Sequence, residues 1–162
     1  SFPTRRSSDL WTVAVRRRDT IDRANRRQNR CFYTSYSEMN EVLNRFAAEA
    51  EADDIWISAE VRDLKENRLG ERLCQIVSMA LDTARHNCIE TTSPKGRYIR
   101  IRSREMQQQM LLKIQFSCED RMIREFDKNI VRMRDLIESY DGYLKIQLDG
   151  DVGNIKIAIP DA

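Results

Sequence analysis

The sequence lacks any apolar run approaching the roughly 18 to 20 residues that span a bilayer, and it has no signal-peptide core. We therefore expect a soluble segment. Its four cysteines are far apart and form no C-x-x-C pair, which argues against a zinc site or a disulfide framework. Reduced, mostly buried thiols are expected instead. The only histidine, His86, lies on the polar side of a predicted helix with no acidic partner beside it, so we assign it no catalytic role.

The chain has the length and composition of one globular domain: 162 residues, 41% apolar and 33% charged. Its net charge is only +2, but seven arginines lie between Arg16 and Arg30. Such a run could bind nucleic acid or anionic lipid. No aromatic residues interleave the arginines, which favours a solvated remnant of a linker or dimerisation helix over residues 11–30.

The first ten residues, SFPTRRSSDL, match codon by codon the translation of a common short-read sequencing adapter. We therefore exclude Ser1–Leu10 from the analysis of the fold and treat them as an assembly artefact. The reading frame is then expected to be truncated, with any sensor, membrane anchor and phosphoacceptor histidine encoded upstream.

Apolar residues repeat at helical spacing over residues 37–52, 73–88 and 122–140. We expect Ser37 to cap the first helix and Gly142 to end the third. The middle helix has the longest apolar stripe, formed by Leu73, Ile76, Val77, Ala80, Leu81, Ala84 and Cys88.

Other segments alternate apolar and polar residues, as half-buried strands do; they span residues 55–61, 97–103, 110–116, 143–148 and 154–159. Polar connections over residues 105–109 and 149–153 predict two antiparallel hairpins. The order α-β-α-β-β-α-β-β predicts an α/β (α+β) two-layer sandwich: one mixed, mainly antiparallel sheet covered on one face by three helices.

Three strings in this order resemble the GHKL ATP-binding domain of sensor histidine kinases, in the subfamily of peptide-responsive kinases. They are LCQIVSMALDTA (Leu73 to Ala84), KGRYIRIRSREMQQQMLLKIQFS (Lys95 to Ser117) and IVRMRDLIESYDGYLKIQLDGDVGNIKIAIP (Ile130 to Pro160). The resemblance covers about residues 31–160 and implies a Bergerat-like ATPase fold over residues 31–162.

The resemblance also implies where a nucleotide would bind. The matching helix normally carries an asparagine that ligates magnesium and a second polar residue one turn earlier, and these positions hold Thr83 and Met79. Threonine is too short to place its oxygen where the amide oxygen lies, and methionine is a poor ligand for a hard cation. Asp82, also part of the family pattern, is retained. Asp82 and Thr83 are thus the residues left to touch a nucleotide, and a solvent-facing role for Asp82 is equally open.

Further family features are missing. Phe116 stands where an asparagine usually precedes the serine, and the glycine-rich turn that brings backbone amides to phosphate aligns with Asp127–Asn129. No glycine occurs between Gly96 and Gly142, and the ATP lid is reduced to about residues 118–126, which have the pattern of the start of a helix.

The leading hypothesis is therefore a histidine-kinase catalytic domain that binds neither ATP nor a metal ion and acts as a pseudokinase or interaction module. Its expected partners are a response regulator or a partner kinase, with homodimerisation through missing N-terminal helices, in the cytoplasmic part of a membrane-anchored bacterial protein. One alternative is an active kinase domain that uses Mg-ATP through Asp82 and Thr83. The other is a nucleic-acid- or lipid-binding module built on Arg16–Arg30.

Overall fold

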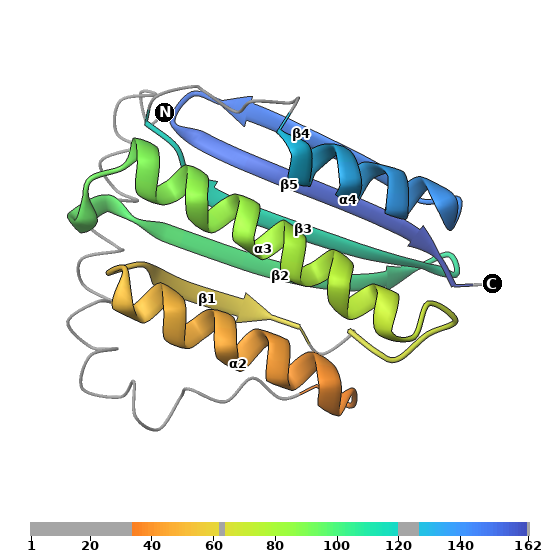
Figure 1. Cartoon of the computed structure of the whole chain (residues 1–162). Helices are drawn as coiled ribbons and strands as arrows, with labels where there is room; N and C mark the ends of the chain where they lie inside the picture. The colour runs from red at the N-terminus through yellow and green to blue at the C-terminus, as the bar shows by residue number, and fades with distance from the viewer. Residues whose placement is uncertain (1–33, 62–63, 120–126, 162) are drawn as a thin grey trace, which may run out of the picture.

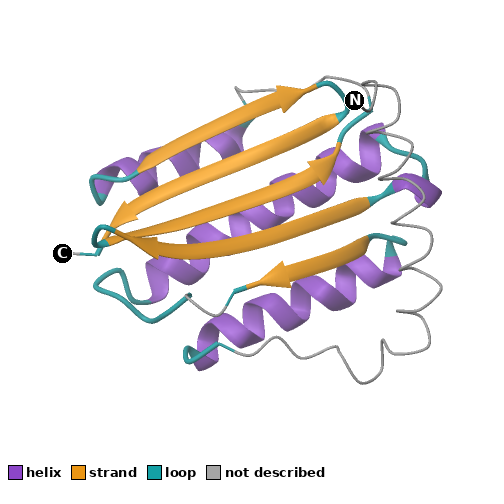
Figure 2. Ribbon diagram, turned by 180° about the vertical axis from the view of Figure 1, so that it is seen from behind, coloured by secondary structure: helices purple, strands orange, loops and turns teal. Residues whose placement is uncertain are grey.

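A five-stranded mixed sheet with three α-helices on one face makes up the structure, a computed structural model that describes residues 34–61, 64–119 and 127–161. Figures 1 and 2 show the helices packed side by side on one face of the sheet, while no described helix lies over the other face. The predicted two-layer sandwich is confirmed. Both the adapter-like residues and Arg16–Arg30 lie outside the described residues, so the hypotheses built on them stay predictions.

The elements follow the predicted order, with one added 3-10 turn. They are α2 (Ser37–Ala52), β1 (Trp56–Glu60), α3 (Glu71–Thr91), η1 (Pro94–Gly96), β2 (Tyr98–Met106), β3 (Gln109–Ser117), α4 (Lys128–Ser139), β4 (Tyr143–Asp149) and β5 (Val152–Pro160). The strand order is β1-β2-β3-β5-β4. Only the β1–β2 pair is parallel, so the sheet is mixed and mainly antiparallel, as predicted.

The core lies between the helices and the inward-facing side chains of the strands. Every residue of the predicted α3 stripe is buried, with at most 1% of its surface exposed. The stripe packs on isoleucines and other apolar side chains that alternate along the central strands, including Ile99, Ile101, Leu112, Ile114, Ile155 and Ile157. Burial of these two matched apolar surfaces holds helix and sheet together.

Both predicted helix caps need correction. Ser37 is the first residue of α2 rather than its cap; Tyr36 holds the cap position without a side-chain hydrogen bond, and its buried ring anchors the chain instead. At the end of α4 the left-handed residue is Asp141, with φ of 59°, and not Gly142. Gly142 is needed for space, since a Cβ there would lie 2.7 Å from Ile137 Cγ2 and 2.9 Å from the Ala158 carbonyl oxygen.

The hairpin connections are tighter than predicted. Gln107 and Gln108 alone join β2 to β3, with φ of 52° and 61°, the two positive values that a type I′ turn requires. Gly150 and Asp151 likewise join β4 to β5. The third helix was predicted from residue 122, but α4 begins at Lys128, and residues 122–126 lie outside the described part of the chain.

Candidate functional site

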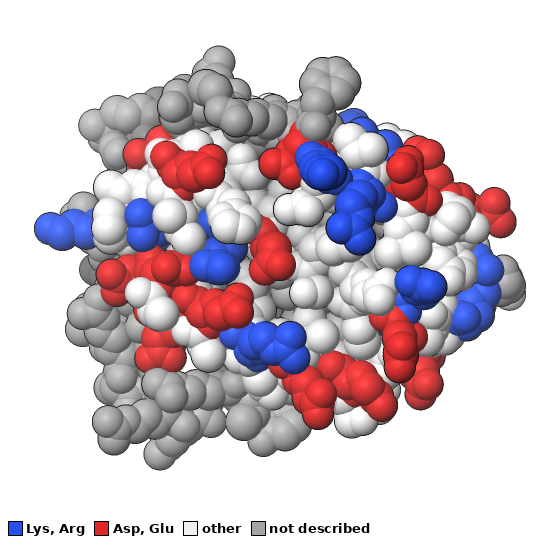
Figure 3. All heavy atoms as spheres, in the orientation of Figure 1, with Lys and Arg blue, Asp and Glu red and all other residues white. Residues whose placement is uncertain are grey.

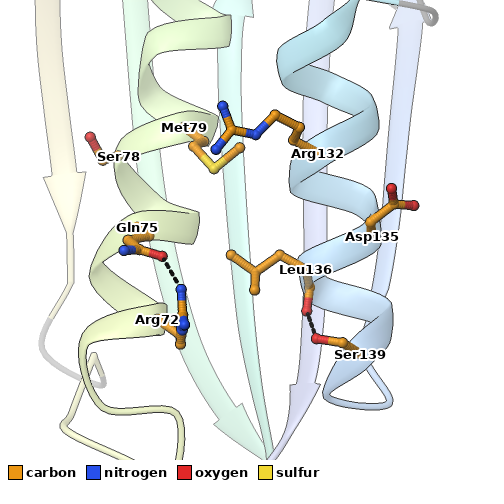
Figure 4. Close-up of a pocket in the computed structure, with 8 residues that line it drawn as sticks. All are labelled: Arg72, Gln75, Ser78, Met79, Arg132, Asp135, Leu136 and Ser139. Carbon is orange, nitrogen blue, oxygen red and sulfur yellow. Dashed lines mark hydrogen bonds between the residues drawn. The ribbon is translucent and has the colours of Figure 1, made fainter.

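A groove of about 720 Å³ hollows the helix-covered face between α3 and α4 (Figure 4). Such a volume is typical of small-molecule sites, which occupy about 300 to 1,000 Å³. The lining residues are Arg72, Gln75, Ser78 and Met79 from α3, and Arg132, Asp135, Leu136 and Ser139 from α4.

The sequence pattern positions these residues on the flanks of the two helices. Arg72, Gln75 and Met79 recur at three and four residues, one position from the buried stripe, so they share one side of α3. In Figure 4 Met79 lies opposite Arg132, and Leu136 points across the groove toward α3. Our sequence analysis missed all of these residues except Met79. The signal was present in the polar residues at helical spacing beside each apolar stripe.

The groove carries more positive than negative charge. Two guanidinium groups, Arg72 and Arg132, outnumber its one carboxylate, Asp135. Arg72 donates from Nη1 to Gln75 Oε1 at 3.1 Å, and Ser139 donates from Oγ to the Leu136 carbonyl at 2.6 Å. The lining includes no histidine or cysteine that could serve as base or nucleophile. Within residues 34–61, 64–119 and 127–161, no three His, Cys, Asp or Glu side chains are grouped to hold a metal ion.

Asp82 and Thr83, the two positions predicted to touch a nucleotide, point in different directions. They are neighbours on α3, and successive helical residues lie about 100° apart around the axis. Asp82 is exposed, whereas Thr83 is buried, with 8% of its surface exposed. The Thr83 hydroxyl donates to the Met79 carbonyl at 2.9 Å, a bond within the helix. Neither residue lines the groove, and their assignment to a nucleotide site stays a prediction.

Phe116 and Ser117, at the end of β3, are buried and contribute to the packing of the domain. The Phe116 ring is fully buried over Gly153 on β5, so this position adds to the core. Ser117 Oγ accepts from the Tyr98 backbone amide at 3.2 Å and lies 3.1 Å from Cys88 Sγ. Burial is the main cause that raises the pKa of the Cys88 thiol, which favours the protonated, unreactive form. His86 is exposed, in agreement with its predicted place on the polar side of α3.

Asp127 occupies the N-terminus of α4, where the resemblance places the glycine-rich turn. Its Oδ1 accepts from the Asn129 backbone amide at 2.8 Å, which makes Asp127 the side-chain cap of the helix. The free amides and positive dipole end of a helix otherwise form an anion site. Here a carboxylate already occupies that position, so the helix end is stabilised from within the chain and repels a further anion.

No helix among the described residues has both the length and the apolar composition needed to cross a membrane.

Residues 71–160 match the family described as GHKL domain, more than half of the chain. No curated protein sequence matches the chain. Among solved structures, the catalytic domain of histidine kinase ThkA is similar, with a TM-score of 0.57 and 18% identity over 77% of this chain and 90% of that one. The Acinetobacter baumannii histidine kinase AdeS has a TM-score of 0.57 and 12% identity over 96% of this chain and 76% of that one. A histidine kinase from Burkholderia phymatum STM815 has a TM-score of 0.62 and 12% identity over 80% of this chain and 70% of that one. At these identities, the likeness shows the fold alone.

Proposed function

Because the chain belongs to the GHKL domain family, we propose that it is the catalytic-type domain of a sensor histidine kinase whose nucleotide site has degenerated, and that it works as an interaction module. The assignment to a signalling system rests on fold analogy. The proposed loss of nucleotide binding rests on the residues of the site.

The capped N-terminus of α4 is the observation that carries this proposal. A glycine-rich turn would let backbone amides approach a phosphate closely. Asp127 replaces it with a carboxylate that accepts the Asn129 amide at 2.8 Å. Binding a triphosphate at this end would require breaking that cap and bringing two negative groups together, and both changes are unfavourable.

The other positions do not fit Mg-ATP either. Met79 offers a thioether, a poor ligand for magnesium. Thr83 is buried and its hydroxyl proton is already donated within the helix. Phe116 fills the core where the family usually has an amide. A lost hydrogen bond to a charged group costs about 1.5 to 3 kcal/mol. Two or three such losses would move a site of micromolar affinity to the millimolar range or beyond.

In the proposed role the domain engages proteins rather than nucleotides. Its partners would be a response regulator or another kinase protomer, and helices preceding the domain would bring two copies together. The domain would then act in the cytoplasmic portion of a membrane-anchored bacterial receptor. The groove between α3 and α4, with Arg72 and Arg132 on its walls, offers one surface for such contacts.

Calorimetric titration of the chain with ATP and magnesium tests the proposal. We expect no saturable heat up to about 1 mM ATP, while a GHKL kinase domain with an intact asparagine and glycine turn, used as a control, binds in the same buffer. Saturable binding in the micromolar range would overturn the proposal and favour the active kinase that uses Asp82 and Thr83.

Two variants make the test sharper. Thr83→Asn alone should not restore binding, because the cap at Asp127 and the buried Phe116 are separate defects. Asp127→Gly combined with Thr83→Asn should bind Mg-ATP more tightly than Thr83→Asn alone, because it also removes the cap, although the buried Phe116 remains. Thermal melts of both variants separate a failure to bind from a failure to fold.

A further inference from the structure

The face of the sheet without helices carries an unusual row of positive charge. Arg102 on β2 pairs directly with Lys113 on β3, Lys113 pairs with Lys156 on β5, and Lys156 pairs with Lys145 on β4. Directly paired residues point to the same side of the sheet. These four residues, here named the cation row, therefore stand side by side across four neighbouring strands. Figure 2 shows the sheet from this side.

The cation row takes no part in the ion pairs formed among the described residues. Within the residues that the structure describes, no side chain of the row forms an ion pair or a hydrogen bond. Lys113, Lys145 and Lys156 are exposed. The Nε of Arg102 is enclosed and has no acceptor. Among the described strands, this side carries two acids: Glu60 on β1 stands directly opposite Arg102 at one end of the row, and Asp149 lies farther along β4 from Lys145. The helix-covered face differs, since acidic and basic side chains are interspersed there (Figure 3).

Such an arrangement is unfavourable for the isolated fold. Like charges directly opposite each other on neighbouring strands destabilise a sheet, and an enclosed donor without an acceptor adds a further cost. A single acid at the position of Lys156 would make two of the three like-charged pairs attractive. An anionic ligand relieves them as well, because it supplies the missing acceptors and neutralises the repulsion.

An apolar strip runs beside the cation row. The next register positions hold Leu111, Ala158 and Tyr143, and Tyr143 is 59% exposed. Together with Arg104 and members of the row, these residues line a shallow hollow of about 380 Å³. A partner that fits this surface must present acidic groups in one line and apolar groups in the line beside it.

We propose that this face docks an acidic amphipathic helix of another protein, laid across the strands. Neighbouring strands lie about 4.8 Å apart, and successive turns of an α-helix rise about 5.4 Å. Glutamates placed one turn apart thus meet successive strands, and the flexible lysines absorb the small mismatch. Apolar residues on the adjoining helix face cover Leu111 and Tyr143.

The same surface is less suited to a single-stranded nucleic acid. Sequence-tolerant binding of single strands relies on several aromatic platforms for successive bases. On this face, Trp56 and Tyr98 are buried at 6% and 5% exposure, which leaves Tyr143 as the one aromatic that a described strand exposes. The α3–α4 groove lies on the opposite face of the sheet, so whatever binds there does not occupy this surface.

Fluorescence anisotropy with the full chain tests the proposal. The probe is a labelled helix-forming peptide of about 20 residues, with Glu one turn apart and Leu on the adjoining face. A peptide with Gln for every Glu and a 20-nucleotide oligo-dT serve as comparisons. We expect saturable binding of the Glu peptide at low salt that weakens as salt rises, with weaker binding of both comparisons. Stronger binding of oligo-dT, or no binding of the Glu peptide, would overturn the proposal.

Matched variants locate the contact. Lys113→Gln/Lys156→Gln should weaken binding of the Glu peptide about tenfold or more, since two close charge pairs are lost. The control Lys95→Gln/Lys128→Gln removes the same charge from exposed lysines outside the sheet and should change binding less than threefold. Equal loss in both variants would mean that only net charge matters, which contradicts a docking site.

A stability measurement separates docking from a structural role. Lys156→Glu should abolish binding of the Glu peptide while raising the thermal midpoint by about 2 °C, because it converts two repulsive cross-strand pairs into attractive ones. A lower midpoint for Lys156→Glu would show that the cation row supports the fold, and would contradict the proposal.

Discussion

Replacing Gly153 by alanine gives a direct test of the sheet register and of the place assigned to Phe116. A Cβ at position 153 would lie 2.3 Å from Cζ and 2.4 Å from Cε2 of the Phe116 ring. Ordinary carbon contacts are about 3.5 to 4.0 Å. The two residues are paired across β3 and β5, and Phe116 is fully buried, so the ring has little room to retreat.

Overpacking of this kind typically costs about 1 to 3 kcal/mol. At about 2 kcal/mol, a chain of this size loses about 4 to 8 °C in thermal midpoint. Urea unfolding followed by circular dichroism should show a lower midpoint concentration with an unchanged slope, the sign of altered stability without altered compactness. Gly96→Ala is the matched control, because a Cβ there lies 3.4 Å from Thr92 Cγ2, an ordinary contact.

A double-mutant cycle isolates the cause. In a Phe116→Leu background the ring is gone, so Gly153→Ala should cost less than half of what it costs with Phe116 present. The reasoning is refuted if Gly153→Ala leaves stability unchanged, or if its cost is the same in both backgrounds.

Two other predictions concern the core. Leu81→Ala removes a side chain with 1% exposure from the centre of α3 and should cost about 2 to 5 kcal/mol, measured by urea unfolding; a cost below 1 kcal/mol would contradict the packing of α3 on the sheet. The raised pKa of Cys88 means that the folded chain keeps a proton that the unfolded chain loses above the ordinary pKa of 9.0, so stability should fall as pH rises past 9. That fall should be smaller in Cys88→Ala, and equal slopes between pH 8 and 10 for the two proteins would count against the assignment.

The sequence alone determined the elements and their faces. The apolar stripe from Leu73 to Cys88 predicts a buried helix because its period of three and four residues leaves one continuous apolar side. Alternation in the strands likewise separates Ile99 and Ile101 from Arg100 and Arg102. Such periodicities are local properties of the backbone, so they can be read without the tertiary structure. The absence of glycine around Asp127 was equally visible in the sequence.

Only the tertiary structure decided how distant residues meet. The cation row depends on the register of four strands that lie up to 54 positions apart, from Arg102 to Lys156, and no local pattern specifies that register. The same holds for the Phe116 ring over Gly153 and for the groove between α3 and α4. The end of α4 also depends on its surroundings: Ile137 and Ala158 leave no room for a side chain at position 142, which is glycine, and the left-handed residue is Asp141. Packing between elements, rather than the preference of single residues, made these choices.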